Sequence, residues 1–319
     1  MGTDMGQNKD RKYKNLIIFN VFMMIFFAIT LCIGTFNDEA LARSMFTPDN
    51  LFLKYLTSTG VFPFFAGAVF FTGSLCERII DSGLKKGNKI ILCVIFYAAA
   101  TFVGFIGAGS IVDKDCLGNI YPELNRNIPV IVGICLVTNP VLLVTGFIFA
   151  RKAEDKQLIK RLITILVLLG ISYALLQVFK NSFSRPRYRL VAEGFEDVCY
   201  FPWYIRFPYA AELVDKFGID KGEFRSFPSG HSILSMSVIV ILQTLSWYSA
   251  KLKDKRMLMG ITGLIFALII MSTRMILGAH YLSDVSFGAL ISSVMALIYT
   301  IVQHRITLSH GDRRYGNEH

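Results

Sequence analysis

The stretch "FPSGHS" at residues 227–232 stands directly before the apolar run "ILSMSVIVILQTLSW" at residues 233–247. The apolar run has the composition of a membrane-crossing helix. Such a helix needs no proline, glycine or histidine at its start. The motif therefore raises the question of what His231 does at the end of a membrane helix, since a lone histidine there is more often a cap than a catalyst.

The rest of the chain has the same apolar character. Apolar residues make up 53% of the 319 residues, and the mean hydropathy is +0.50. About 20 mostly apolar residues cross the roughly 30 Å of hydrocarbon in a bilayer. Eight runs of this kind lie at about residues 15–36, 51–75, 89–110, 128–150, 161–180, 232–249, 257–275 and 283–303. This pattern predicts an all-α, polytopic transmembrane bundle of about eight helices.

Basic residues fall in alternate connections between these runs, at about residues 9–14, 78–89, 151–161, 251–256 and 305–314. Because cytoplasmic loops carry an excess of Lys and Arg, the pattern predicts an integral protein of the cell membrane with both termini cytoplasmic. The formal net charge of +10 is then explained by these cytoplasmic loops, whose basic residues set the orientation of the protein and attract anionic lipid headgroups. The sequence has no interleaved basic and aromatic surface, and we expect no nucleic-acid partner.

Three polar clusters are predicted together on the extracytoplasmic face. The first is the opening motif, the second is "KNSFSRPRYR" at residues 180–189, and the third is "STRMILGAHYLSD" at residues 272–284. Charged residues at membrane helices are costly and usually functional. One carboxylate, Asp284, cannot balance the cations of these clusters, whereas a phosphate dianion can. Arg binds phosphate oxygens through paired hydrogen bonds, so the clusters predict a phosphate site.

The opening motif can serve such a site in two ways. Ser229 and Gly230 lie where free backbone N–H groups at a helix start face an anion. Taken alone, Pro-Ser-Gly is also explained as a turn with an N-cap. His231 favours the functional interpretation, because it and His280 are the two histidines outside the C-terminal tail.

The two histidines predict a specific reaction. Asp284 follows His280 by four residues, so in a helix the two share a face, and the carboxylate can orient the imidazole and stabilise positive charge on it. We expect His280 to attack phosphorus and His231 to protonate the departing oxygen. Water then cleaves the phosphohistidine, with His231 acting as the base.

Two histidines and a carboxylate are also a common zinc or iron ligand set. The cations Lys180, Arg187 and Arg274 would repel a dication, and we therefore expect no metal and no other cofactor. A disulfide between Cys116 and Cys199 is an open alternative, because both fall in predicted outside loops.

At these residues the chain resembles the type 2 phosphatidic acid phosphatases (PAP2), lipid phosphatases related to vanadium haloperoxidases and bacterial acid phosphatases. The family's second motif, Pro-Ser-Gly-His, is intact at residues 228–231. The third motif is Ser-Arg, five residues, His, three residues, Asp. It is kept as Arg274, His280 and Asp284, with Thr273 in place of the serine.

The first family motif, Lys, six residues, Arg-Pro, is less well matched. Lys180 and Arg187 have the expected separation, but Tyr188 replaces the proline. The chain's Arg-Pro pair is Arg185-Pro186, so Arg185 is a second candidate for the phosphate ligand.

The resemblance covers about residues 161–303 and implies a PAP2-like helical core there. It implies a nucleophilic His280, a leaving-group acid His231, and the phosphate ligands Lys180, Arg187, Ser229, Gly230 and Arg274. The expected division is an N-terminal membrane region of about four helices at 1–160, the core at 161–303, and a disordered cytoplasmic tail at 304–319. The sequence leaves the purpose of the first four helices open.

These predictions together favour a metal-independent membrane phosphatase that hydrolyses a lipid phosphate or diphosphate at the extracytoplasmic face. A lipid is favoured because helix ends near the headgroups carry the reactive residues. One alternative is a phosphatase of a soluble ester, or a phosphotransferase. Another is a non-catalytic lipid transporter or scramblase, in which polar residues such as Asn139 and Gln177 would line a path.

Overall fold

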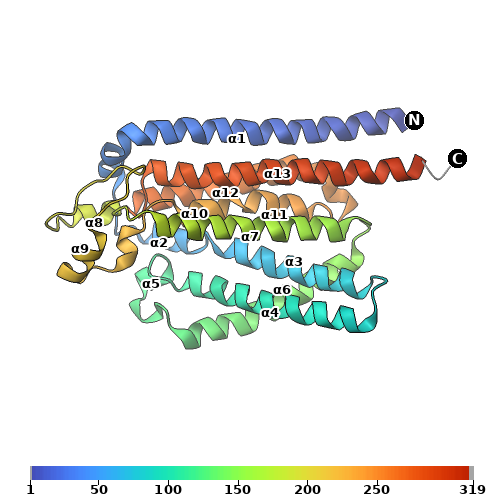
Figure 1. Cartoon of the computed structure of the whole chain (residues 1–319), viewed down its shortest axis with the longest axis horizontal. Coiled ribbons are helices and arrows are strands. Elements are labelled where there is room, and N and C mark those ends of the chain that lie inside the picture. The colour runs from blue at the N-terminus through green and yellow to red at the C-terminus, as the bar shows by residue number, and fades with distance from the viewer. Residues whose placement is uncertain (1, 316–319) are drawn as a thin grey trace.

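The computed structural model describes the backbone of residues 2–315 and the side chains of residues 10–309. His310, His319, Lys9, Arg313 and Arg314 lie outside the described side chains. Residues 2–315 are helices and connections without a strand (Figure 1). The all-α prediction is confirmed.

Seven helical segments are long and apolar enough to cross a membrane, so the protein is an integral membrane protein. They are α1 (Gly2–Met45), the pair α2 (Leu51–Ser58) and α3 (Phe62–Ile80), α4 (Lys86–Ile111), α6 (Ile128–Lys152), α7 (Leu158–Ser182), α12 (Arg256–Ile276) and α13 (Leu282–Tyr315). The eighth predicted segment, 232–249, forms two short helices instead, α10 (Gly230–Met236) and α11 (Val238–Leu245). They meet at Ser237 and together are shorter than the other spans.

Shorter helices lie in the connections. They are α5 (Leu117–Ile120), η1 (Pro122–Leu124), α8 (Tyr188–Ala192), α9 (Ala210–Phe217), η2 (Lys221–Phe224) and η3 (Ala250–Lys255). The predicted disordered tail is wrong for residues 304–315, because α13 continues through Tyr315. Residues 316–319 lie outside the described part of the chain.

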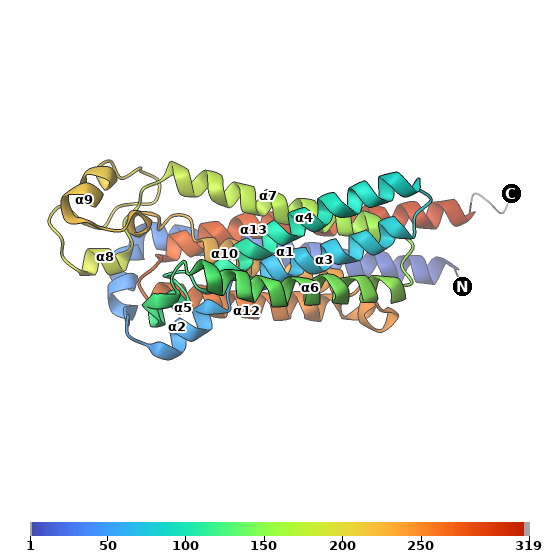
Figure 2. The ribbon, with the colours of Figure 1, turned by 90° about the horizontal axis from the view of Figure 1, so that it is seen from below.

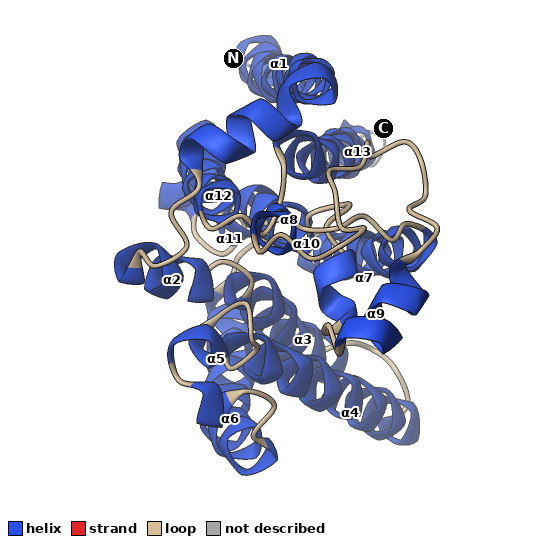
Figure 3. Cartoon of the chain, turned by 90° about the vertical axis from the view of Figure 1, so that its left-hand side faces the viewer, coloured by secondary structure: helices blue, strands red, loops and turns tan. Residues whose placement is uncertain are grey.

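Seen end-on, the short helices α10 and α11 run through the middle of the bundle (Figure 3). Helices α12 and α13 pack on one side of them and α7 and α3 on the other, while α4 and α6 extend the bundle beyond α3. Helix α1 lies against α13. A helix buried on all sides must be apolar or small all round, and α10 and α11 meet this condition with a "SILSMSVIVIL" run at residues 232–242.

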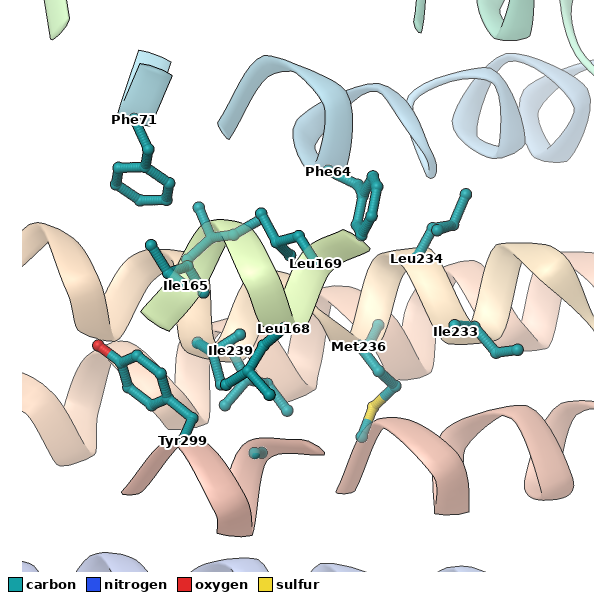
Figure 4. Packing of buried hydrophobic residues seen from close by; sticks show 14 of the residues in the cluster. Phe64, Phe71, Ile165, Leu168, Leu169, Ile233, Leu234, Met236, Ile239 and Tyr299 are labelled. Carbon is teal, nitrogen blue, oxygen red and sulfur yellow. The ribbon is translucent and has the colours of Figure 1, made fainter. Parts of the chain in front are cut away.

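The core forms where α7, α10, α11, α3 and α13 meet (Figure 4). It includes Phe64, Phe71, Ile165, Leu168, Leu169, Ile233, Leu234, Met236, Ile239 and Tyr299. Because lipid tails are as apolar as these side chains, close packing rather than hydrophobicity holds such helices together. Glycine permits the closest approach: a Cβ at Gly146 of α6 would lie 2.0 Å from the Phe70 carbonyl oxygen of α3.

Polar residues inside the spans also serve this packing. Asn139 of α6 is buried, and its Nδ2 donates to Cys135 Sγ at 3.0 Å and to the Thr101 carbonyl of α4 at 3.4 Å. These are contacts between and within helices, as expected of an interhelical polar residue.

The two ends of the bundle differ. Both termini and the connections α3–α4, α6–α7 and α11–α12 lie at one end, which is where the basic segments gather (Figures 1 and 2). The opposite end carries α2, α5, α8 and α9 and the long segment 183–229 (Figure 2). The cytoplasmic assignment of the terminal end stays a prediction.

Candidate active site

All the predicted site residues lie at the end of the bundle opposite the termini. Lys180 is in the last turn of α7, Ser229 caps α10, Arg274 is in the last turn of α12, and Asp284 is in the first turn of α13. His280 lies in the turn between α12 and α13, Gly230 and His231 begin α10, and Arg185 and Arg187 lie between α7 and α8. Residues separated by about a hundred positions are thereby brought to one place.

His280 is held by the turn that ends α12. Gly278 adopts a left-handed φ of +66°, and a Cβ there would lie 2.5 Å from the Phe46 ring. The His280 side chain is only 1% exposed, and its Nδ1 lies 2.7 Å from the Ser226 carbonyl oxygen. Because a carbonyl only accepts hydrogen bonds, Nδ1 carries the proton, and the lone pair is left on Nε2.

Asp284 acts on His280 mainly through charge and through Ser226. The distance from His280 Nδ1 to Asp284 Oδ2 is 3.8 Å, which is too long for a hydrogen bond. The Ser226 hydroxyl donates to Asp284 Oδ2 at 2.5 Å, and the Tyr281 backbone N–H donates to the same oxygen at 2.8 Å. The predicted pair is close in space, although His280 precedes α13 instead of sharing its face.

The surroundings keep His280 neutral. Burial and the positive charges of Lys180, Arg274 and Arg187 lower the pKa of His280 to about 3, and Asp284 opposes this effect. Neutral imidazole is the form with a free lone pair, which a nucleophile requires.

Arg185 and Arg187 have different surroundings. The guanidinium of Arg185 is 1% exposed and donates to Asp284 Oδ1 at 2.6 Å, to Asp38 Oδ2 at 2.8 Å and to Ser283 Oγ at 2.9 Å. It also lies 4.0 Å from the centre of the Tyr281 ring. Arg185 is therefore occupied by protein partners and holds Asp284 in place.

Arg187 and Arg274 have guanidinium N–H groups that make no hydrogen bond to residues 10–309. The Nε atoms of both residues are buried and make no hydrogen bond within the described part of the chain, and Nη2 of Arg274, also without a hydrogen bond, lies 3.2 Å from Asp115 Oδ2. Lys180 Nζ, close by, donates to the Arg225 carbonyl at 2.9 Å. A buried donor without an acceptor costs about 1–3 kcal/mol. These groups are therefore suited to an anion with several acceptor oxygens.

The opening motif takes the N-cap role. Ser229 Oγ accepts from the Ser232 N–H at 3.3 Å, and the Ser229 N–H donates to the Asp284 carbonyl at 3.1 Å. The Ser229 N–H is thus engaged within the protein. Gly230 begins α10, and a Cβ there would lie 3.5 Å from Lys180 Cε, so the lysine chain runs past the helix start.

A carboxylate absent from the sequence prediction lies among these cations. Asp115, in the connection between α4 and α5, pairs with Arg187 at 2.5 Å, Arg189 at 2.8 Å and Arg274 at 3.2 Å. Burial opposes its ionisation, but the three guanidinium groups outweigh burial and hold the pKa of Asp115 well below its usual range. The N-terminal region thus reaches into the site.

The next residue, Cys116, is also at the site. It is buried, and its Sγ lies 3.7 Å from Nε2 of His231. Cys199 is exposed, and both are free thiols, so the open alternative of a disulfide between them is not realised.

Three site residues escaped sequence reasoning: Asp38, Asp115 and Ser226. Asp38 carried a signal, since it is a carboxylate near the end of a long apolar helix. Ser226 directly precedes the opening motif, and its partner, Asp284, was already a candidate. Asp115 stands between other polar residues of a loop and had no comparable signal.

Comparison with known families agrees with this geometry. Residues 161–308 match the family model described as the PAP2 superfamily. Searches of curated proteins and of solved structures gave no match. The matched segment contains both histidines, Asp284 and the cations Lys180, Arg187 and Arg274. Residues 161–308, somewhat less than half of the chain, are therefore similar to the PAP2 superfamily.

Proposed function

We propose that the protein is an integral-membrane phosphatase that hydrolyses a lipid phosphate or diphosphate through a phosphohistidine, without a metal ion. The match of residues 161–308 to the PAP2 superfamily supports phosphatase chemistry at the coarse level. One observation carries the proposal: the neutral imidazole of His280 lies in the field of Arg187 and Arg274, whose buried donors lack acceptors. Phosphate oxygens would satisfy those donors.

In the first half-reaction, Nε2 of His280 attacks phosphorus and the bond from phosphorus to the leaving oxygen breaks. Burial and the charge of Arg274 lower the pKa of His231, but a phosphate dianion bound beside it opposes both effects, so that His231 is protonated in the complex. It donates this proton to the leaving oxygen. Arg187, Arg274 and Lys180 balance the charge on the remaining phosphate oxygens, and Asp284 stabilises the positive charge that develops on the imidazole.

In the second half-reaction, water attacks the phosphohistidine and gives a proton to His231. The phosphorus–nitrogen bond breaks, inorganic phosphate leaves, and His280 returns to its neutral form with the proton on Nδ1. Both histidines end in the state in which they began, so the cycle needs no other reactant.

The position of the site favours an amphiphilic substrate. Its groups lie at the ends of α7, α10, α12 and α13, where headgroups would lie if these helices span the bilayer. Tyr204 and Tyr209 of the adjoining segment are exposed, as is typical of aromatic residues at headgroup level. A lipid could then present its phosphate while its chains remain in the membrane. The basic segments at the opposite end favour an extracytoplasmic site.

Phosphate release by purified protein in mixed micelles tests this proposal. The panel contains phosphatidate, phosphatidylglycerophosphate, diacylglycerol pyrophosphate, a polyprenyl diphosphate and the soluble ester p-nitrophenyl phosphate. We expect release from at least one lipid and loss of release in His280→Ala. His304→Ala is the matched control, because His304 lies at the terminal end and is 3.0 Å from Asp10.

The panel separates the alternatives. Release from the soluble ester alone would replace the lipid with a soluble substrate. Wild-type turnover in His280→Ala would remove His280 as the nucleophile. No release from any compound would refute the hydrolase and favour a lipid-handling protein.

A further inference from the structure

The carboxylate of Asp115 occupies the position in which the proposed function requires an anion. Its Oδ1 lies 2.5 Å from Arg187 Nη1, and its Oδ2 lies 3.2 Å from Arg274 Nη2. The Asp115 backbone carbonyl also accepts from Arg274 Nη1 at 3.1 Å. One residue thus contacts both arginines that are expected to bind phosphate.

The charges do not balance in this arrangement. Asp115 supplies one negative charge to the guanidinium groups of Arg187 and Arg274, which carry two positive charges. Donors on both arginines are still buried without an acceptor. A phosphate dianion has twice the charge of a carboxylate and more acceptor oxygens, so it is the better partner for the same two side chains.

The third partner of Asp115, Arg189, has a second carboxylate partner. Arg189 makes two hydrogen bonds to the Glu223 carboxylate, at 2.8 Å and 2.6 Å. If Asp115 leaves, Arg189 keeps a carboxylate while Arg187 and Arg274 lose theirs. The vacated acceptor position therefore belongs to the pair that the PAP2 motifs assign to phosphate.

The segment that carries Asp115 lies against the buried site residues. His280 and Arg274 are each 1% exposed, and Cys116 lies against His231. Val112 anchors the start of this segment in an apolar cluster with Ala108, Ile131 and Cys135. Polar contacts hold the part that follows, since Lys114 Nζ donates to Asp220 at 2.7 Å and to Glu223 at 2.9 Å. Such contacts break at a lower free-energy cost than a packed apolar core, because water can replace them.

We propose that Asp115 is an internal substitute for the substrate's phosphate group, which binds Arg187 and Arg274 in the unliganded protein and leaves when a phosphate dianion enters. Residues 113–116 then withdraw with Asp115 and expose His280, while Val112 stays packed. This inference rests on the proposed function for the identity of the ligand. Asp115 then gives the N-terminal half of the chain a function at the site. By competing with phosphate for Arg187 and Arg274, it lowers the apparent affinity of the site for phosphate.

Calorimetric titration of the purified protein with inorganic phosphate tests the inference. Because a site that is mostly closed lowers apparent affinity by its open fraction, Asp115→Asn should bind phosphate about tenfold tighter or more. Glu196→Gln is the matched control, since it removes a carboxylate from an exposed ion pair with Lys216 that touches neither the two arginines nor the Asp115 segment. We expect its affinity to equal that of the wild type. Unchanged or weaker binding in Asp115→Asn would overturn the inference and make Asp115 a residue that positions the arginines.

A second variant covers the case in which Asp115→Asn does not fold. In Gly118→Ala the new Cβ would lie 2.6 Å from the Val112 carbonyl oxygen and 2.9 Å from the Asp113 carbonyl oxygen. It should displace the turn at residues 113–116 from the arginines without removing the Asp115 carboxylate from the chain. It should also bind phosphate more tightly, and wild-type affinity would count against the inference. Titration measures binding and not turnover. Tighter binding without lipid hydrolysis would therefore refute the proposed function alone, and hydrolysis without tighter binding would refute this inference alone.

Discussion

Arg185 Nη1 lies 2.6 Å from Asp284 Oδ1, with both side chains buried at the centre of the site end. The same guanidinium bonds to Asp38 of α1, and Asp38 in turn accepts from the Ser283 backbone N–H at 2.9 Å. One arginine therefore joins the first helix, the segment after α7 and the start of α13. The residue that fixes Asp284 beside His280 is thus itself held by the N-terminal helix.

Replacing Arg185 and Arg187 in turn by alanine should distinguish an arginine that stabilises the fold from one that binds phosphate. Arg185→Ala leaves two buried carboxylates, Asp38 and Asp284, without their cation, and we expect a loss of about 3–5 kcal/mol of stability. Arg187→Ala should lower the affinity for phosphate with a much smaller effect on stability. Thermal unfolding and phosphate titration measure the two effects. A stable Arg185→Ala protein with weakened phosphate binding would reverse the assignment.

Asp284→Asn should lower kcat by about 10²- to 10⁴-fold and change KM little. The amide keeps the volume of the side chain but removes the charge that stabilises an imidazolium, as in a serine-protease triad. Because Asp284 also contacts Arg185, the unfolding temperature of the variant should be recorded with its kinetics. A folded variant with unchanged kcat would show that the carboxylate is not needed for the chemistry.

The stability of the protein should fall as the pH is lowered from 6.5. His280 has a pKa of about 3 in the folded protein against 6.5 as a free side chain, so between these values the unfolded chain binds the extra proton. Unfolding is therefore favoured progressively across this window. Thermal unfolding from pH 8 to pH 4 measures the slope, and His280→Gln should reduce it; His231, whose pKa burial also lowers, supplies the remainder. Equal slopes for the two proteins would contradict the buried neutral imidazole.

A second acid-sensitive group acts at lower pH. Although burial opposes it, hydrogen bonds from Arg189 and the charge of Arg187 lower the pKa of Glu223 from 4.5 to about 2. Its stabilisation is complete above pH 4.5 and is lost as the pH falls through 2. Glu223→Gln should therefore destabilise the protein at pH 7 and narrow the difference from the wild type at pH 3. A difference that stays constant with pH would rule out this ion pair as the cause.

Removal of divalent metal should leave phosphate release unchanged. Lys180, Arg187 and Arg274 supply the positive charge that a metal ion would otherwise provide. Activity with saturating EDTA is compared with activity after re-addition of Mg²⁺ or Zn²⁺. A loss of activity that either metal restores would contradict the metal-free mechanism.

Much of the fold could be predicted from the sequence, because the bilayer imposes one simple requirement. A run such as residues 128–150 must be helical if it is to cross, and α6 covers it. The prediction failed for residues 232–249, where α10 and α11 are short. Hydropathy cannot distinguish a helix facing lipid from one buried within the bundle, since both are apolar.

The sequence by itself determined the helical class and supplied the candidate reactive side chains, since motif spacing and apolar length are properties of the chain alone. Only the tertiary structure decided which arginine faces the site, and it alone placed Asp38 and Asp115 there. Asp115 is 72 residues from Arg187 and 159 from Arg274. Contacts at such separations depend on how whole helices pack, and many side chains set that packing together. The local sequence pattern determines the secondary structure of a segment, whereas the packing of the helices determines which partners each charged side chain contacts.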